Sequence, residues 1–167
     1  VEAATRISDY NAVTRLSGGT QSGRFLGIDR VDFPKVASAS WRWDYAPSSL
    51  GEMMNAMALS PDAVLVSREF MDIHRLKPND IIRVEASLQG ARAEMDMRVV
   101  GGFDYFPTWY PETGPLIVGN LDYFFQEAQG QFPYRVWFVT EKDMDYLDLR
   151  EDIWEINLGA EALISTS

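Results

Sequence analysis

Cysteine is missing from this chain, and histidine occurs once, at His74. Without cysteine there is no disulfide framework, thiol nucleophile or thiolate zinc site. A lone histidine without a GxSxG motif gives no support to a catalytic triad. We therefore expect His74 to lie at the surface or half-buried at the end of a short helix. No glycine-rich phosphate loop is present either, because "SGGTQSG" lacks the GxxxxGK[ST] spacing and a following helix.

Positive charge and long apolar runs are also scarce. The chain has 15 Lys and Arg against 25 Asp and Glu, a net charge of −10, so it lacks the basic face of a nucleic-acid-binding protein and we expect no nucleic-acid partner. No apolar run reaches the roughly 18 residues of a membrane span. The first residues resemble no signal peptide. With 46% hydrophobic residues among 167, the chain can bury one sizeable core or two small ones.

The acidity is concentrated near the end of the chain, where residues 141–167 carry two Lys and Arg against eight Asp and Glu. Residues 141–156 are predicted to form a helix capped by Thr140, with an apolar stripe. A calcium site is an alternative for its aspartates, but an EF-hand glycine and glutamate are missing, and a helix would splay these side chains. We expect a solvated face and no metal. The stripe is Met144, Leu147, Ile153 and Trp154, and the aspartates are Asp143, Asp145, Asp148 and Asp152.

Periodicity predicts strands interleaved with short helices, a mixed α/β or α+β fold class. The clearest signal is the alternation of apolar and polar residues over 81–100, typical of a β-hairpin with one buried face. Ser49 and Glu52 have the spacing of a capping box before a helix over 49–59. Other strands are predicted at 4–16, 24–28, 62–67, 115–119 and 134–140. Further short helices are predicted after Asp32, Ser67 and Asn120.

Aromatic residues gather in two segments, 41–45 and "GFDYFPTWYPETGP" at 102–115. Such rings can form a core, contact a partner protein or lipid, or stack on sugars. The spacing of two in 41–45 predicts an extended segment with its three rings on one side. In 102–115 we expect Phe103 and Phe106 to be buried and the later rings to lie nearer the surface. The candidates for partner or ligand contact are Trp109, Tyr110, Tyr105, Trp41 and Trp43.

One segment carries a family resemblance: "DAVLVSREFMDIHRLKPNDIIRVEA…MRVVGGF", residues 62–103. It is similar to the pattern of the extracytoplasmic domain of FtsX-like or MacB-like ABC-transporter permeases, in which a strand ending in Ser precedes a short helix, a gL-x-x-GD turn and two strands. Asn79 stands where that family usually has Gly, and Asn tolerates a left-handed backbone. "FLGIDRVDFPKV" at 25–36 is also similar, so the resemblance covers roughly 24–140.

The resemblance implies a two-lobed periplasmic domain without enzymatic activity or cofactor. Residues 1–60 and 116–167 would form a porter-like α/β lobe, and 61–115 an inserted, mostly β sabre-like lobe with its connector. The domain would lie on the extracytoplasmic side of the cell membrane. Transmembrane helices outside this sequence would link it to a cytoplasmic ABC ATPase, whose ATP-driven movement it would relay to a substrate, lipoprotein, peptide, lipid or cell-wall partner. Whether two copies pair is left open.

Two other functions stay open at this point. The aromatic segments would also suit a secreted module that binds carbohydrate or protein. A hydrolase built on a pair of carboxylates has the least support, because such a pair meets in space and leaves no fixed spacing in a sequence. The sequence therefore favours a binding domain that is not an enzyme.

Overall fold

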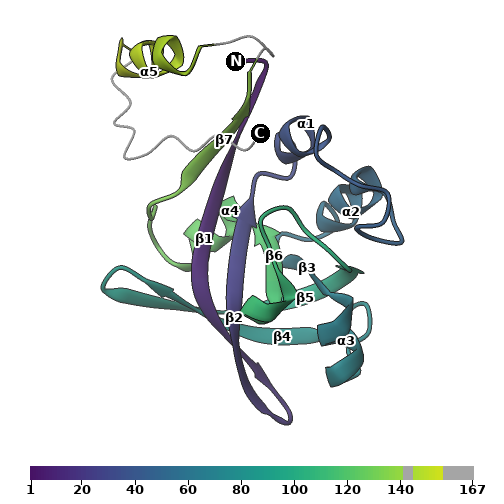
Figure 1. Cartoon of the computed structure of the whole chain (residues 1–167). Helices are drawn as coiled ribbons and strands as arrows, with labels where there is room; N and C mark the ends of the chain where they lie inside the picture. Colours follow the sequence, from purple (N-terminus) through teal and green to yellow (C-terminus); the bar gives the residue numbers. More distant parts are fainter. Residues whose placement is uncertain (141–144, 156–167) are drawn as a thin grey trace.

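The structure is a computed structural model, and it describes residues 1–140 and 145–155. Its centre is a closed barrel of six strands in the order β2, β6, β3, β5, β4 and β1, with β1 pairing back onto β2 (Figure 1). A further strand, β7, pairs with the first part of β1 outside this ring. The strands are β1 (Ala3–Leu16), β2 (Gly19–Ile28), β3 (Ala63–Ser67), β4 (Ile81–Leu88), β5 (Ala91–Phe103), β6 (Leu116–Asn120) and β7 (Arg135–Val139).

The closed barrel overturns the expected architecture of a porter-like lobe with an inserted sabre-like lobe. The predicted hairpin exists as β4 and β5, but it forms part of the barrel wall: β5 pairs in parallel with β3, and β4 pairs antiparallel with β1. The physical reason is its apolar face, because Ile82 and Met97 pack into the same buried cluster as Phe25 of β2. A hairpin alone cannot supply a core of its own, so these strands share the core of the barrel.

Strands β1 and β2 form a long hairpin that pairs from Ile7↔Ile28 to Leu16↔Gly19. The predicted Gly/Ser-rich turn is confirmed, but it is tight, and Gly19 adopts a φ of +130° that favours glycine. With 14 residues, β1 is long enough to pair with β2, β4 and β7 along different parts of its length. Strand β1 therefore forms hydrogen bonds with strands from the early, middle and late parts of the chain.

Two buried clusters lie on opposite faces of the barrel strands. In β3, Val64 and Val66 face a cluster inside the barrel, whereas Ala63 and Leu65 face the outside. The outer cluster is covered by α1 (Phe33–Ala37) and α2 (Leu50–Met57), which Figure 1 shows on one side of the molecule. The capping box of α2 is confirmed: the Ser49 backbone N–H donates to the Glu52 carboxylate at 2.8 Å, and Ser49 Oγ accepts from the Glu52 N–H at 3.2 Å.

The remaining helices are α3 (Arg68–His74), α4 (Leu121–Glu127) and α5 (Tyr146–Glu155). Phe70 of α3 is buried against the barrel, whereas Ile73 on the same helix is 63% exposed. Asn79, in the turn after α3, has a φ of +78°, and the expected left-handed backbone is confirmed. The Thr140 cap of the acidic helix depends on residues 141–144, which lie outside the described residues, as does Met144.

The expected apolar stripe of α5 is not packed against the barrel. Leu147 is 56% exposed and Trp154 is 71% exposed, whereas Leu149, which was not assigned to the stripe, is buried. The helix carries four carboxylates and one arginine, and it lies at the periphery, near the end of the β1–β7 ribbon (Figure 1). An acidic surface at this end of the molecule is therefore confirmed.

Candidate functional site

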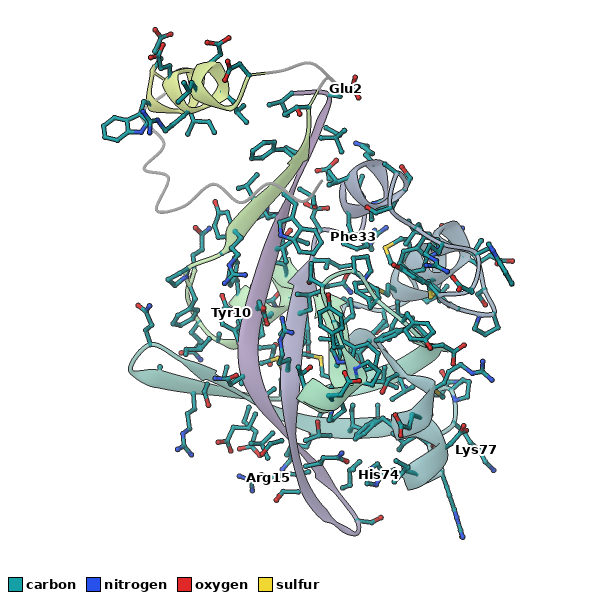
Figure 2. All side chains as sticks on the ribbon, in the orientation of Figure 1. Glu2, Tyr10, Arg15, Phe33, His74 and Lys77 are labelled. Atoms are coloured by element: carbon teal, nitrogen blue, oxygen red, sulfur yellow. The ribbon has the colours of Figure 1, made fainter. Side chains whose placement is uncertain are left out.

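The two aromatic segments predicted from the sequence meet on the side of the barrel that α1 and α2 cover. Phe106 is central to this contact: its ring stacks on Phe33 with the centroids 5.5 Å apart, and it meets the edge of Trp41 at 5.7 Å. Figure 2 shows Phe33 between α1 and the strands. Phe103 and Phe106 are both buried, as predicted. Half of the eight rings in these segments therefore belong to the outer core or pack against it.

Trp109 is part of that core, which corrects its placement near the surface. Only 6% of the residue is exposed, its ring meets Phe103 at 5.7 Å, and its Nε1 donates to the carbonyl oxygen of Gly114 at 2.9 Å. The cause is local: Thr108 has a φ of +64°, and the resulting turn brings Trp109 back toward the barrel. Tyr110, in contrast, is 69% exposed, as predicted.

The segment 41–45 is a tight turn, so the prediction of an extended strand with three rings on one side was wrong. The N–H of Tyr45 donates to the carbonyl of Arg42 at 3.1 Å. The turn brings Trp41 and Tyr45 together, with their ring centroids 5.3 Å apart, while Trp43 at the tip is 91% exposed. Trp41 is only half-buried. In this turn, Trp41 and Tyr45 therefore contact each other, whereas Trp43 is exposed to solvent.

Trp43 lies on a turn whose conformation is fixed by an ion pair and by backbone hydrogen bonds. Arg42 forms a two-bond ion pair with Asp44, at 3.1 and 2.9 Å. The carbonyl of Tyr45 accepts from the N–H groups of Asp104 and Tyr105, at 2.7 and 3.0 Å, which ties the turn to the second aromatic segment. A tryptophan exposed on a preorganised turn is typical of the anchor of a binding surface. The exposed rings of the candidate site are Trp43, Tyr105 and Tyr110.

A shallow pocket of about 390 Å³, lined by both polar and apolar side chains, lies at the carboxyl ends of the parallel strands β2 and β6. Arg6 lies at its edge, bonded to Asp29 at 3.3 Å and to Asp122 at 3.0 Å. Burial lowers the pKa of Arg6, but the two carboxylates outweigh this and raise the pKa above its ordinary value. Asn120, predicted only as a helix cap, donates its side-chain N–H to the carbonyl of Pro61 at 3.0 Å.

Sequence reasoning missed this pocket, because its lining residues come from three separate segments, within 28–31, 57–61 and 120–126. The one available signal was the occurrence of polar residues directly after two apolar strands, as in Asp29 after β2 and Asn120 at the end of β6. The carboxylates of Asp29 and Asp122 both accept hydrogen bonds from Arg6.

No metal-binding cluster is found in residues 1–140 and 145–155. No three His, Asp or Glu side chains there come together around a common point. His74 is half-buried, as expected, with its Nε2 2.7 Å from Gln21 Oε1 and its ring against Phe70. Asp143, one of the aspartates considered for calcium, lies outside these residues.

Comparison with known proteins adds no assignment: no protein-family model matches the chain, and no curated protein matches its sequence. Within the described residues, no helix combines the length and the apolar composition required to cross a bilayer.

Proposed function

We propose that this chain is a non-enzymatic extracytoplasmic domain of an ABC-transporter permease. In this role it binds a substrate or an extracytoplasmic partner and relays to it the movement driven by a cytoplasmic ABC ATPase. The proposal begins from the pattern of residues 62–103, which resembles FtsX-like and MacB-like permeases. It does not depend on the two-lobed architecture, which the barrel replaces. A single barrel can transmit movement if its attachment to the membrane-spanning segments is close and firm.

The observation that supports this role most directly is the pairing of β1 with β7. Ala3 lies opposite Val139, so the chain enters the barrel and leaves it side by side at one end (Figure 1). A domain inserted between two neighbouring membrane helices needs this arrangement, because both connections must reach the same membrane surface. Glu2 lies at this end, and Arg15 lies toward the opposite end, near the β1–β2 turn (Figure 2). The turn would then point away from the membrane.

The displayed rings support the binding part of the proposal. Trp43 projects from a fixed turn, and Tyr105 and Tyr110 are exposed on the neighbouring aromatic segment. Aromatic anchors of this kind are enriched where proteins contact partners. We propose Trp43, Tyr105 and Tyr110 as contact residues, with the half-buried Trp41 as support for the turn. Trp109 has a structural role in the core.

Labelling of a single cysteine tests the location, because the chain contains no cysteine of its own. Thr20→Cys places a thiol at the exposed β1–β2 turn of the full-length protein, in a background from which any other cysteines have been removed. A membrane-impermeant maleimide should label it in intact spheroplasts as fully as after lysis, and an ABC ATPase should copurify with the solubilised protein. Labelling only after lysis, or purification without an ATPase, would contradict the proposal.

Photo-crosslinking tests the contact residues. A photoreactive amino acid in place of Trp43 or Tyr110 should capture an extracytoplasmic component, whereas the same amino acid in place of Trp154 should not. Trp154 is a suitable control because it is also strongly exposed, at 71%, but lies on α5. Equal capture from all three positions would remove the assignment of these rings to a binding surface.

A secreted module that binds carbohydrate or protein is the second candidate, and the exposure of Trp43 favours it. Exposed rings can stack on the apolar face of a sugar. The permease domain and the secreted module differ in whether the protein is attached to the membrane and in whether it binds carbohydrate. A secreted module would be recovered from the medium without a membrane anchor, and Trp43→Ala would abolish its binding on a glycan array. A glycan array without any binding would remove the carbohydrate version.

A further inference from the structure

Among the described residues, one edge of strand β7 has no pairing partner. In the part of the chain that the structure describes, its single neighbour is β1, with which it pairs from Ala3↔Val139 to Ile7↔Arg135. The β1–β7 ribbon runs outward from the barrel (Figure 1). The edge of β7 away from β1 therefore carries backbone N–H and C=O groups that can pair with another strand.

The edge has few of the features that usually prevent strand addition: the charged Arg135 begins the strand, which has five residues but contains no lysine, proline or bulge. Natural edge strands are protected by charged side chains, above all lysine, by proline, by a bulge or by a very short length. The sequence of β7 is RVWFV, which is β-branched and aromatic, and its register with β1 is regular. Val136 is 49% exposed and Phe138 is half-buried. A strand added here would gain hydrogen bonds and an apolar contact together.

The strand is held in position before any partner arrives. Trp137 packs into the outer core, with its ring centroid 6.3 Å from that of Phe33. Just before β7, the hydroxyl of Tyr10 donates to the carbonyl of Pro133 at 2.9 Å. The contact of Trp137 fixes one face of β7, and the hydrogen bond to Pro133 fixes the residues just before the strand. Because β7 is already ordered, binding costs little conformational entropy, which favours association.

Charge identifies the kind of partner. The chain has a net charge of −10, and the end of the ribbon lies near Glu2 and the acidic helix α5 (Figures 1 and 2). A second copy would bring the same acidic helix to the edge, and like charges oppose such pairing. We propose that β7 accepts an extended, lysine- or arginine-bearing segment of a partner protein as an additional strand. This inference rests on β7 and holds whether or not the chain belongs to a permease.

Peptide binding to the complete 167-residue chain tests this inference. The probe is a synthetic peptide of alternating lysine and valine, and its counterpart has glutamate in place of lysine. We expect the lysine peptide to bind and to slow amide hydrogen exchange along Arg135–Val139. Val136→Lys should weaken that binding by at least about tenfold, because it places like charges together. The control Ile81→Lys should leave binding unchanged.

Ile81 is a matched control because it is also 49% exposed, but its strand β4 is paired on both sides. Three results would overturn the proposal: equal binding of the glutamate peptide, no change in exchange along β7, or equal weakening by the two lysine variants. A fourth is self-association of the chain in sedimentation experiments that Val136→Lys abolishes, because the occupant would then be a second copy. None of these outcomes bears on the ATPase association that tests the permease proposal.

Discussion

The indole Nε1 of Trp109 donates a hydrogen bond to the carbonyl oxygen of Gly114 across 2.9 Å. This bond closes the aromatic segment onto itself while the ring of Trp109 packs against Phe103. Beyond it, the carbonyl of Pro115 accepts from the N–H of Arg24 at 2.9 Å, which docks the segment on β2. The three prolines and the rings thus form a stiff cover of the outer core.

Trp109→Phe should lower the free energy of unfolding by about 1–3 kcal/mol, because it removes the donor to Gly114 from a buried site. Urea unfolding of the complete chain measures the change. The neighbouring substitution Tyr110→Phe is the control: it changes a residue that is 69% exposed, and its effect should stay within about 0.5 kcal/mol. Similar effects of the two substitutions would show that the Trp109 hydrogen bond contributes little.

Gly27→Ala and Gly51→Ala should change stability in opposite directions. A Cβ at Gly27 would lie 2.4 Å from Ser8 Oγ and 2.9 Å from Leu121 Cδ1, so we expect a loss of about 1–3 kcal/mol. A Cβ at Gly51 in helix α2 would meet nothing within 4 Å, so alanine should stabilise by about 0.5 kcal/mol through its helix propensity. Thermal unfolding compares the two, and a neutral Gly27→Ala would contradict the close approach of α4 to β2.

Thr108→Gly should stabilise the protein by about 1 kcal/mol, because a β-branched residue at a φ of +64° is strained and glycine is not. Thr113→Gly, five residues later, should instead destabilise it, since Thr113 Oγ1 donates to the carbonyl of Tyr110 at 2.7 Å. The denaturant midpoints of the two variants, compared with the parent chain, show whether each substitution raises or lowers the stability. A loss of stability in Thr108→Gly would mean that the Thr108 side chain contributes more than its backbone strain costs.

The carboxyl of Glu85 on β4 should titrate below its ordinary pKa of 4.5, mainly because Arg15 donates a hydrogen bond to it, with added charge from Arg92. A lowered pKa in the folded state means that the stabilisation is present above pH 4.5 and is lost as the pH falls through the lower value. Arg15→Gln should move the pKa back toward 4.5 in a carbon-13 NMR titration, and the control Arg135→Gln should not. A Glu85 that titrates normally in the parent chain would refute this.

The sequence predicted most of the local structure, because each element has a local cause. The capping box of α2 and the alternation over 81–100 both depend on residues close in the chain, and both were confirmed. The barrel was missed because its closure depends on distant pairs such as Ala12↔Ala86, which periodicity does not encode. Of the candidate contact residues, Trp43 is exposed but Trp109 is buried, since a left-handed turn at Thr108 decided where that ring points.

The arrangement of β1 and β7 also decides how the domain would respond to force. A pull on the two connections, which leave side by side, would load the ribbon first at Ala3↔Val139 and then one pair at a time toward Ile7↔Arg135. The pairs that close the barrel, from Ile7↔Ile28 onward and at Ala12–Arg15, come later along β1. The ribbon would therefore carry the load before the barrel does, and the pairs that close the barrel would be reached only after the ribbon pairs had separated.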